Sequence, residues 1–291
     1  MSNWQSFKKK HVLLMNAAFT VAIPAAVWLI MELLNLAFCG VHTLNSTVDY
    51  TTLMRNLVTS FCFALGLNCN LPVGRMDTST GSQMYLACII GGNIALSLNL
   101  GGVGVLVFSM LFGMLAGGFV GFLFINMRIL PMVLGLGISL VYECISFSMY
   151  NQQGLNLFGK PGVSILSNWG FIIIVTLLVM LVMTYLFQYS GFGYNRRAIQ
   201  GNQKLAHDAG INIYKNAAAG ALVAIAGVFD TAYKSSLVPV LGMNSNSTVF
   251  ANMFPMAVGV WLAKKSNPVV GILAGSLSVQ FLILGLAKFT A

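Results

Sequence analysis

The sequence predicts an all-α, polytopic membrane protein with about nine or ten transmembrane helices. Hydrophobic residues make up 57% of its 291 residues and charged residues only 7%, whereas about a quarter of a typical soluble domain is charged. The mean hydropathy is +0.83. Apolar stretches of about 20 residues, which is the length needed to cross a bilayer, recur along the whole chain. We therefore expect most of the surface to face a lipid bilayer.

Nine apolar stretches account for these predicted spans. They cover approximately residues 12–34, 51–71, 82–100, 103–125, 131–150, 168–189, 214–234, 248–263 and 268–288. The first follows a short basic start and is interpreted as a retained span, not a cleaved signal peptide. Ser235–Ser247 contains Pro239 and Gly242 and is expected to be an outer loop or a re-entrant piece. No soluble domain or linker is apparent, so we predict one membrane domain over residues 1–291.

The lysines and arginines predict how the chain is oriented. With the N-terminus in the cytoplasm, eleven of the 15 basic residues fall in inner loops and only Arg55, Lys160, Lys234 and Lys288 fall outside. This asymmetry follows the positive-inside rule. It places a charged loop at about 190–212 in the cytoplasm and, after nine spans, the last residue outside. The net charge of +9 arises from this distribution, so nucleic acid is not an expected partner.

Motifs that would indicate catalysis do not occur in the sequence. It has no Gly-rich loop ending in Gly-Lys-Ser/Thr, no His-Glu-x-x-His pair and no Gly-x-Ser-x-Gly elbow. Its five cysteines lack metal-ligand spacing and are expected to be buried small hydrophobes, not a disulfide set. We therefore predict no catalytic residue, no metal site and no cofactor, and we do not expect an enzyme.

A polar stretch follows the second predicted span. Asn68 and Asn70 precede a break at Pro72–Gly74, and Asp77 and Ser79 follow it. Amide side chains both donate and accept hydrogen bonds and so suit solute hydroxyls. One interpretation is a solvated cytoplasmic turn. The other is a break that lines a polar pathway, for which Asn68, Asn70, Asp77 and Ser79 are the candidate residues, and which requires the helix to be broken or unwound there.

Glu143 is the only acid in the middle of an apolar stretch. Acids within the membrane usually face the bundle interior, where they bond another helix or relay an ion; the helix–helix hydrogen bond is the favoured interpretation. Asp230 and Lys234 have the spacing of an ion pair on one helix face. Glycines at every fourth position over 113–121 predict close helix packing.

Four separated stretches carry a further pattern. They are Gly66–Ser82, Asn126–Gly135, Gly193–Asn212 and Ala217–Gly227. The first has Gly, Asp, Ser, Gly and Ser at positions 74, 77, 79, 81 and 82, and the third ends in Ala-x-x-x-Gly-Ile-Asn. In this order they resemble the permease subunits of ATP-binding-cassette importers of the ribose, xylose and galactoside type, a group that includes branched-chain amino acid and nucleoside permeases. The chain departs from that pattern at Arg75, where the family has Gly, and at Tyr194, where it has Arg.

The resemblance implies an all-helical permease subunit in the bacterial cytoplasmic (inner) membrane that takes up a small polar solute, a sugar or a nucleoside. Its partners would be a second, identical or different, permease subunit, a soluble extracytoplasmic solute-binding protein and ABC ATPase subunits. The ATPases would dock on a coupling helix within 190–212, with the docking residues Asn202, Lys204, Ala206, Ala209, Gly210 and Ile211. Two alternatives stay open: an ion-coupled secondary transporter or channel that uses Glu143, and a structural subunit without transport activity.

Overall fold

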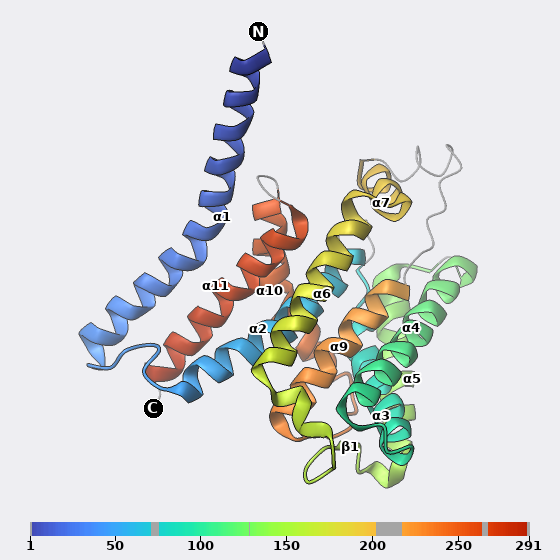
Figure 1. Ribbon diagram of the computed structural model, residues 1–291. Coiled ribbons are helices and arrows are strands. Elements are labelled where there is room, and N and C mark those ends of the chain that lie inside the picture. The colour runs from blue at the N-terminus through green and yellow to red at the C-terminus, as the bar shows by residue number, and fades with distance from the viewer. Residues whose placement is uncertain (1, 71–75, 128, 202–216, 264–266, 290–291) are drawn as a thin grey trace. The chain divides into compact units, whose positions relative to one another are not determined.

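The computed structural model describes residues 2–70, 76–127, 129–201, 217–263 and 267–289, and this part of the chain is almost entirely helical (Figure 1). The elements are α1 (Ser2–Phe38), α2 (Thr47–Asn70), α3 (Thr80–Ser97), α4 (Gly101–Met127), α5 (Pro131–Ser148), η2 (Tyr150–Gln152), β1 (Leu155–Asn156), η3 (Val163–Ser167), α6 (Trp169–Gln188), α7 (Gly191–Gly201), α9 (Ala217–Lys234), β2 (Ser236–Leu237), α10 (Asn246–Ala263) and α11 (Pro268–Phe289). Within the described residues, each of the nine apolar stretches expected from the sequence overlaps a helix. The all-α prediction is confirmed.

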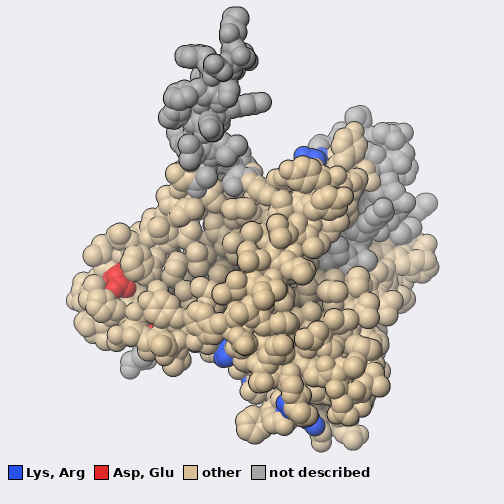
Figure 2. All heavy atoms as spheres, viewed as in Figure 1, with Lys and Arg blue, Asp and Glu red and all other residues tan. Residues whose placement is uncertain are grey.

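Five helices in the described part are long and apolar enough to cross a membrane. They contain Ala18–Phe38, Gly101–Phe124, Pro131–Ser148, Trp169–Gln188 and Pro268–Phe289. Large apolar side chains such as Ile174 and Leu181 on α6 are exposed, which is the arrangement expected of helices that face lipid. Charged side chains are sparse on the face that Figure 2 shows. The protein is therefore a multi-pass membrane protein.

The chain divides into two compact units. Unit 1 comprises residues 1–57 and 254–291, and unit 2 comprises residues 58–253. In unit 1, α1 packs along α11: the rings of Phe38 and Phe289 lie 6.3 Å apart, and the Met31 side chain lies where a Cβ on Gly285 would be. The Lys288 ammonium lies 3.0 Å from the Asp49 carboxylate and ties the end of α11 to the first turn of α2.

Unit 2 is held together by close contacts between α3, α4 and α9. Gly113 and Gly117 of α4 face Gly220 of α9, and a Cβ on Gly220 would overlap the carbonyl oxygen of Gly113. Backbones that approach this closely gain dispersion contacts that side chains would prevent. The close packing predicted from the glycine spacing is confirmed for Gly113 and Gly117.

Irregular backbone precedes α10, as expected for Ser235–Ser247. Residues of β2 pair antiparallel with β1, with Leu155 opposite Leu237, and the helix resumes at Asn246. At the N-terminus of α6, the Asn168 side chain caps the helix by accepting a hydrogen bond from the Gly170 N–H at 3.0 Å. α6 then runs from the end of unit 2 that contains β1 to the end that contains α7 (Figure 1).

The five cysteines are all free thiols. Cys62, Cys69 and Cys88 are buried, as the sequence predicted. The prediction is wrong for Cys39 and Cys144, which are exposed. Cys144 lies about 100° around α5 from Glu143, outside the face formed by the buried residues of this helix.

Candidate functional site

The last turn of α2 places two amide side chains inside unit 2. Asn68 is 1% exposed and Asn70 is 3% exposed. The helix continues through Asn70, while Pro72 and Gly74, which predicted the break, lie outside the described residues. The part of the chain that is described offers no hydrogen-bond partner to the Oδ1 or Nδ2 of Asn70, or to the Nδ2 of Asn68. Buried polar groups are normally satisfied, so these atoms are available to another group.

Arg196 of α7 reaches the end of α2. Its Nη2 donates to the backbone oxygen of Asn68 at 2.8 Å and to the side-chain Oδ1 at 3.0 Å. The guanidinium also lies over the Phe187 ring, 4.4 Å from its centroid. Three contacts therefore fix the guanidinium, and Arg196 connects α7, which forms the first part of the loop at 190–212, with the residues before the break.

The Arg196 guanidinium is a buried cation, with only 8% of the residue exposed. Among the described residues no carboxylate bonds it, and its Nε has no partner. Burial lowers the pKa of Arg196 from its ordinary value, and the nearby Arg197 adds to that shift. Burying a charge without an opposite charge costs free energy, so the two bonds to Asn68 and the Phe187 ring are what hold it there.

A tight turn follows the break. The backbone N–H of Ser79 donates to Asp77 Oδ1 at 2.9 Å, and the Ser79 hydroxyl donates to the same oxygen. From the first full turn of α3, Gln83 donates to Asp77 Oδ2 at 3.3 Å and to the Ser79 hydroxyl oxygen at 2.8 Å. Asp77 is only 5% exposed. The interpretation of Asp77 as a solvated turn residue is therefore wrong, because its carboxylate is enclosed and bonded by its neighbours.

These residues flank the break on both sides. We call them the polar junction: Asn68, Asn70, Asp77, Ser79, Gln83 and Arg196. Sequence reasoning identified the first four. It missed Gln83, although Gln83 follows Ser79 by one helical turn, a spacing that brings side chains together. It also missed Arg196, because no local signal separates Arg196 from the adjacent Arg197.

One face of α5 packs on the turn after the break. Gly135, Ser139 and Glu143 follow one another at four-residue intervals and so share a face. A Cβ on Gly135 would come within 2.7 Å of the Thr78 hydroxyl oxygen. The Ser139 hydroxyl lies 3.4 Å from the Thr78 carbonyl oxygen. The small residues of α5 thus let the turn of the polar junction approach its backbone.

Glu143 completes this face, and its carboxylate holds the turn before α10. Its Oε2 accepts from the Met243 N–H at 2.8 Å and its Oε1 accepts from the Ser245 N–H at 2.9 Å. Met243 has a φ of +64°, a left-handed conformation that costs energy in a non-glycine residue. The favoured hydrogen-bond interpretation is confirmed in kind, although the donors are backbone groups of a turn, not a side chain of another helix.

The remaining predicted residues are placed as follows. Asp230 and Lys234 form the expected ion pair at 2.7 Å. The six docking residues, Asn202, Lys204, Ala206, Ala209, Gly210 and Ile211, lie outside the described residues. In the described ranges no group of His, Cys, Asp and Glu could hold a metal ion. The chemistry that the polar junction offers is hydrogen bonding by amides, hydroxyls and a guanidinium.

Comparison with known proteins gives one match. A family described as branched-chain amino acid transport system / permease component matches residues 50–290. No curated protein and no solved structure matches the chain. The matched range includes every residue of the polar junction and the loop at 190–212.

Proposed function

Because the chain belongs to the family of branched-chain amino acid transport system permease components, we propose that it is the membrane-spanning permease subunit of an ATP-binding-cassette importer. In this proposal the chain translocates a small polar solute, a sugar or a nucleoside, across the bacterial cytoplasmic membrane with its N-terminus in the cytoplasm. It does not hydrolyse ATP itself. A separate ATPase supplies the energy, a second permease subunit completes the pathway, and a soluble binding protein delivers the solute.

The polar junction is the observation that carries this proposal. Unit 2 buries mostly apolar and small side chains, with Glu143 and Asn246 among its other buried polar residues, and at the polar junction it buries two amides, a carboxylate and a guanidinium. Polar groups inside a membrane domain are costly and typically line the route of a solute or ion. Amide atoms of Asn68 and Asn70 without described partners supply donors and acceptors for solute hydroxyl groups. We place the solute pathway along Asn68, Asn70, Asp77 and Ser79.

The loop at 190–212 is the proposed site for the ATPase. α7 forms the first part of this loop, and Arg196 of α7 bonds Asn68 at the end of α2 by two hydrogen bonds. A movement of the loop caused by the ATPase would therefore displace the end of α2. The docking residues in this proposal are Asn202, Lys204, Ala206, Ala209, Gly210 and Ile211, carried over from the family pattern.

The alternative function is an ion-coupled transporter in which Glu143 carries the ion. Both Glu143 oxygens already accept backbone N–H groups, and a carboxylate in this position stabilises a turn at a helix N-terminus. This occupied geometry favours a structural role for Glu143, and we prefer the ATP-driven proposal for that reason.

Replacing Asn70 with leucine should reduce solute uptake about tenfold for each assembled complex, because one lost hydrogen bond of about 1.4 kcal/mol in the transition state corresponds to that factor. The measurement is uptake of labelled ribose, xylose, galactose and uridine by cells, divided by the amount of complex in the same membranes. Asn126→Leu is the matched control, since Asn126 is exposed near the end of α4. If uptake falls only in proportion to the amount of complex, Asn70 packs the protein and does not contact the solute.

A further inference from the structure

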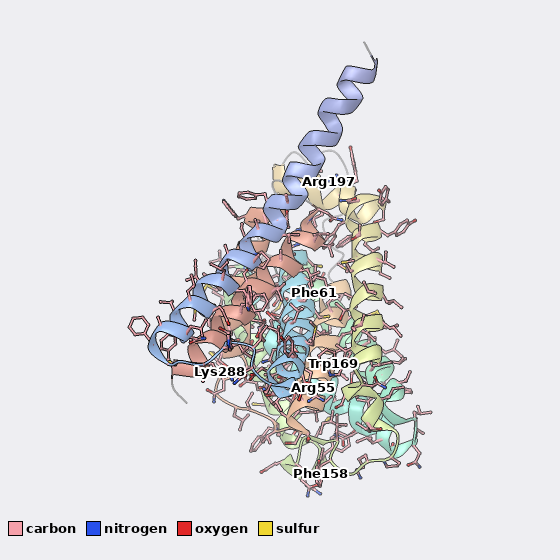
Figure 3. The ribbon with its side chains drawn as sticks, turned by 60° about the vertical axis from the view of Figure 1, so that its left-hand side comes forward. Arg55, Phe61, Phe158, Trp169, Arg197 and Lys288 are labelled. Carbon is pink, nitrogen blue, oxygen red and sulfur yellow. The ribbon has the colours of Figure 1, made fainter. Side chains whose placement is uncertain are left out.

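A polar pocket lies at the end of unit 2 that contains β1. Its volume is about 520 Å³, which lies within the range of small-molecule sites. It is lined by Asn93, Leu96 and Ser97 at the end of α3, by Tyr150, Asn151, Gln153, Gly154 and Asn156, and by Lys160. Figure 3 shows Phe158, from the same segment, and Arg197 of α7 at opposite ends of the ribbon of unit 2. The pocket is therefore distant from the proposed ATPase side and lies on the side predicted to be extracytoplasmic.

Most of the lining groups are uncommitted hydrogen-bonding groups. Within the described part of the chain, no hydrogen bond involves the side chains of Tyr150, Asn151, Gln153 and Lys160. Asn156 uses only its Oδ1, which accepts from the Phe158 N–H at 2.9 Å. Its amide donors remain available. The pocket thus presents several amide donors and acceptors around one ammonium group, with Leu96 and the Tyr150 ring as apolar surfaces.

The segment that contributes Tyr150 and Asn151 to the pocket is held in an unusual backbone conformation. Tyr150, Asn151 and Gln152 have φ values of +51°, +53° and +65°, and three consecutive non-glycine residues in the left-handed region are strained. Such strain persists only where surrounding contacts enforce it, and it concentrates at functional sites. We therefore expect contacts that hold Tyr150–Gln152 in this conformation, and a function for the strained segment.

Neighbouring contacts hold this segment in place. The Asn93 Nδ2 donates to the Gly154 carbonyl oxygen at 2.9 Å and to the Ile89 carbonyl oxygen at 2.8 Å. Immediately after Gly154, β1 pairs with β2, and a Cβ on Gly154 would overlap the Leu237 carbonyl oxygen. Asn93 and this pairing fix the backbone at Gly154 and Leu155, so the backbone on this side of the pocket is positioned before any ligand arrives.

We infer that this pocket binds a small polyhydroxylated solute that is neutral or negatively charged, such as a hexose or a hexuronic acid, before the solute enters the permease. Alternating amide donors and acceptors match a set of neighbouring hydroxyl groups. Lys160 is the only charged residue among the described residues that line the pocket, so a carboxylate on the solute is favoured and a cation is disfavoured. The inference rests on the proposed function for the class of solute, and it adds an outer binding site that is separate from the polar junction.

Cysteine protection in cells from which the outer membrane has been removed tests the pocket directly. Gln153→Cys is introduced after Cys39 and Cys144 have been replaced by serine, and it is labelled with a membrane-impermeant maleimide. D-galactose and D-galacturonate are the probes, and choline is the cationic control. A probe in tenfold excess over its dissociation constant should slow labelling about tenfold. Gln152→Cys is the matched control, because Gln152 is the neighbouring glutamine and does not line the pocket.

Each labelling result either supports or overturns the inferred solute site. Protection of position 153 but not of position 152, with no effect of choline, supports it, and Lys160→Ala should then weaken protection by galacturonate more than by galactose. Absence of protection at position 153 and at a second reporter, Asn151→Cys, overturns it, and so does equal protection at position 152. Labelling needs neither ATP nor a partner. If position 153 is not protected while ATP-driven uptake is intact, only this inference fails. If position 153 is protected but uptake is not ATP-driven, only the proposed function fails.

Discussion

Replacing Arg196 with alanine should expose the end of α2 and make Cys69 react with a maleimide about ten- to a hundredfold faster. Cys69 lies between Asn68 and Asn70 and is 6% exposed. The substitution removes both hydrogen bonds to Asn68 and the contact with the Phe187 ring. A hydrogen bond to a charged group contributes about 1.5–3 kcal/mol, which sets the expected range of rates. Labelling is measured in a chain without Cys39 and Cys144.

Arg197→Ala is the matched control for this experiment. The two substitutions remove the same charge from adjacent positions, but among the described residues the Arg197 side chain bonds only the Gly193 carbonyl oxygen, on its own helix. Figure 3 shows Arg197 on α7. Arg196→Lys should restore slow labelling in part, since an ammonium donates to fewer groups than a guanidinium. Solute uptake should follow the same order among the three variants. Equal labelling rates for Arg196→Ala and Arg197→Ala would show that Arg196 does not hold the polar junction.

Glu143→Leu should strongly destabilise the protein, because the buried Ser245 N–H would lose its acceptor and the turn at Met243 would lose the hydrogen bond that holds it. Each buried unsatisfied donor costs about 1–3 kcal/mol. Glu143→Gln should have a smaller effect, since the amide keeps one acceptor oxygen but directs its own N–H groups toward a donor. The measurement is thermal unfolding of the purified protein in detergent. Cys144→Leu is the control, since Cys144 is the next residue of α5 and is exposed.

The same variants distinguish the two proposed functions. If Glu143 is structural, uptake by Glu143→Gln should fall together with the amount of folded protein. An ion-coupled transporter would instead give a glutamine variant that folds normally, is thermally stable and transports nothing. That result would contradict the structural role that the two hydrogen bonds indicate.

The sequence predicted the helices well because each one is a long apolar stretch that only a helix can carry through lipid. It predicted Asn68, Asn70, Asp77 and Ser79 as polar groups beside a break for the same reason, since polar residues are rare in such a chain. It could not decide between a solvated turn and a buried one. That decision depends on α5, where Gly135 and Ser139 leave room for the turn.

Contacts between segments distant in sequence were beyond prediction. Arg196 meets Asn68 across 128 positions of the chain, and Glu143 meets Ser245 across 102. Neither pair has a local periodicity that would reveal its partner. The pocket beside β1 was missed for a related reason. The left-handed backbone at Tyr150–Gln152 contains no glycine, which is the residue that usually indicates this conformation in a sequence.

In the proposed function, ATP hydrolysis by a separate subunit drives solute uptake through this chain, and uptake into energised vesicles measures this dependence. Labelled sugar or uridine is offered to vesicles that contain the assembled complex, with ATP inside or with a proton gradient alone. We expect uptake that requires ATP, persists with a protonophore and is lost in Gly210→Trp, because a bulky side chain at that glycine should block docking of the ATPase. Uptake that runs on the proton gradient without ATP, and is unchanged in Gly210→Trp, would contradict the ATP-driven function and support the ion-coupled alternative.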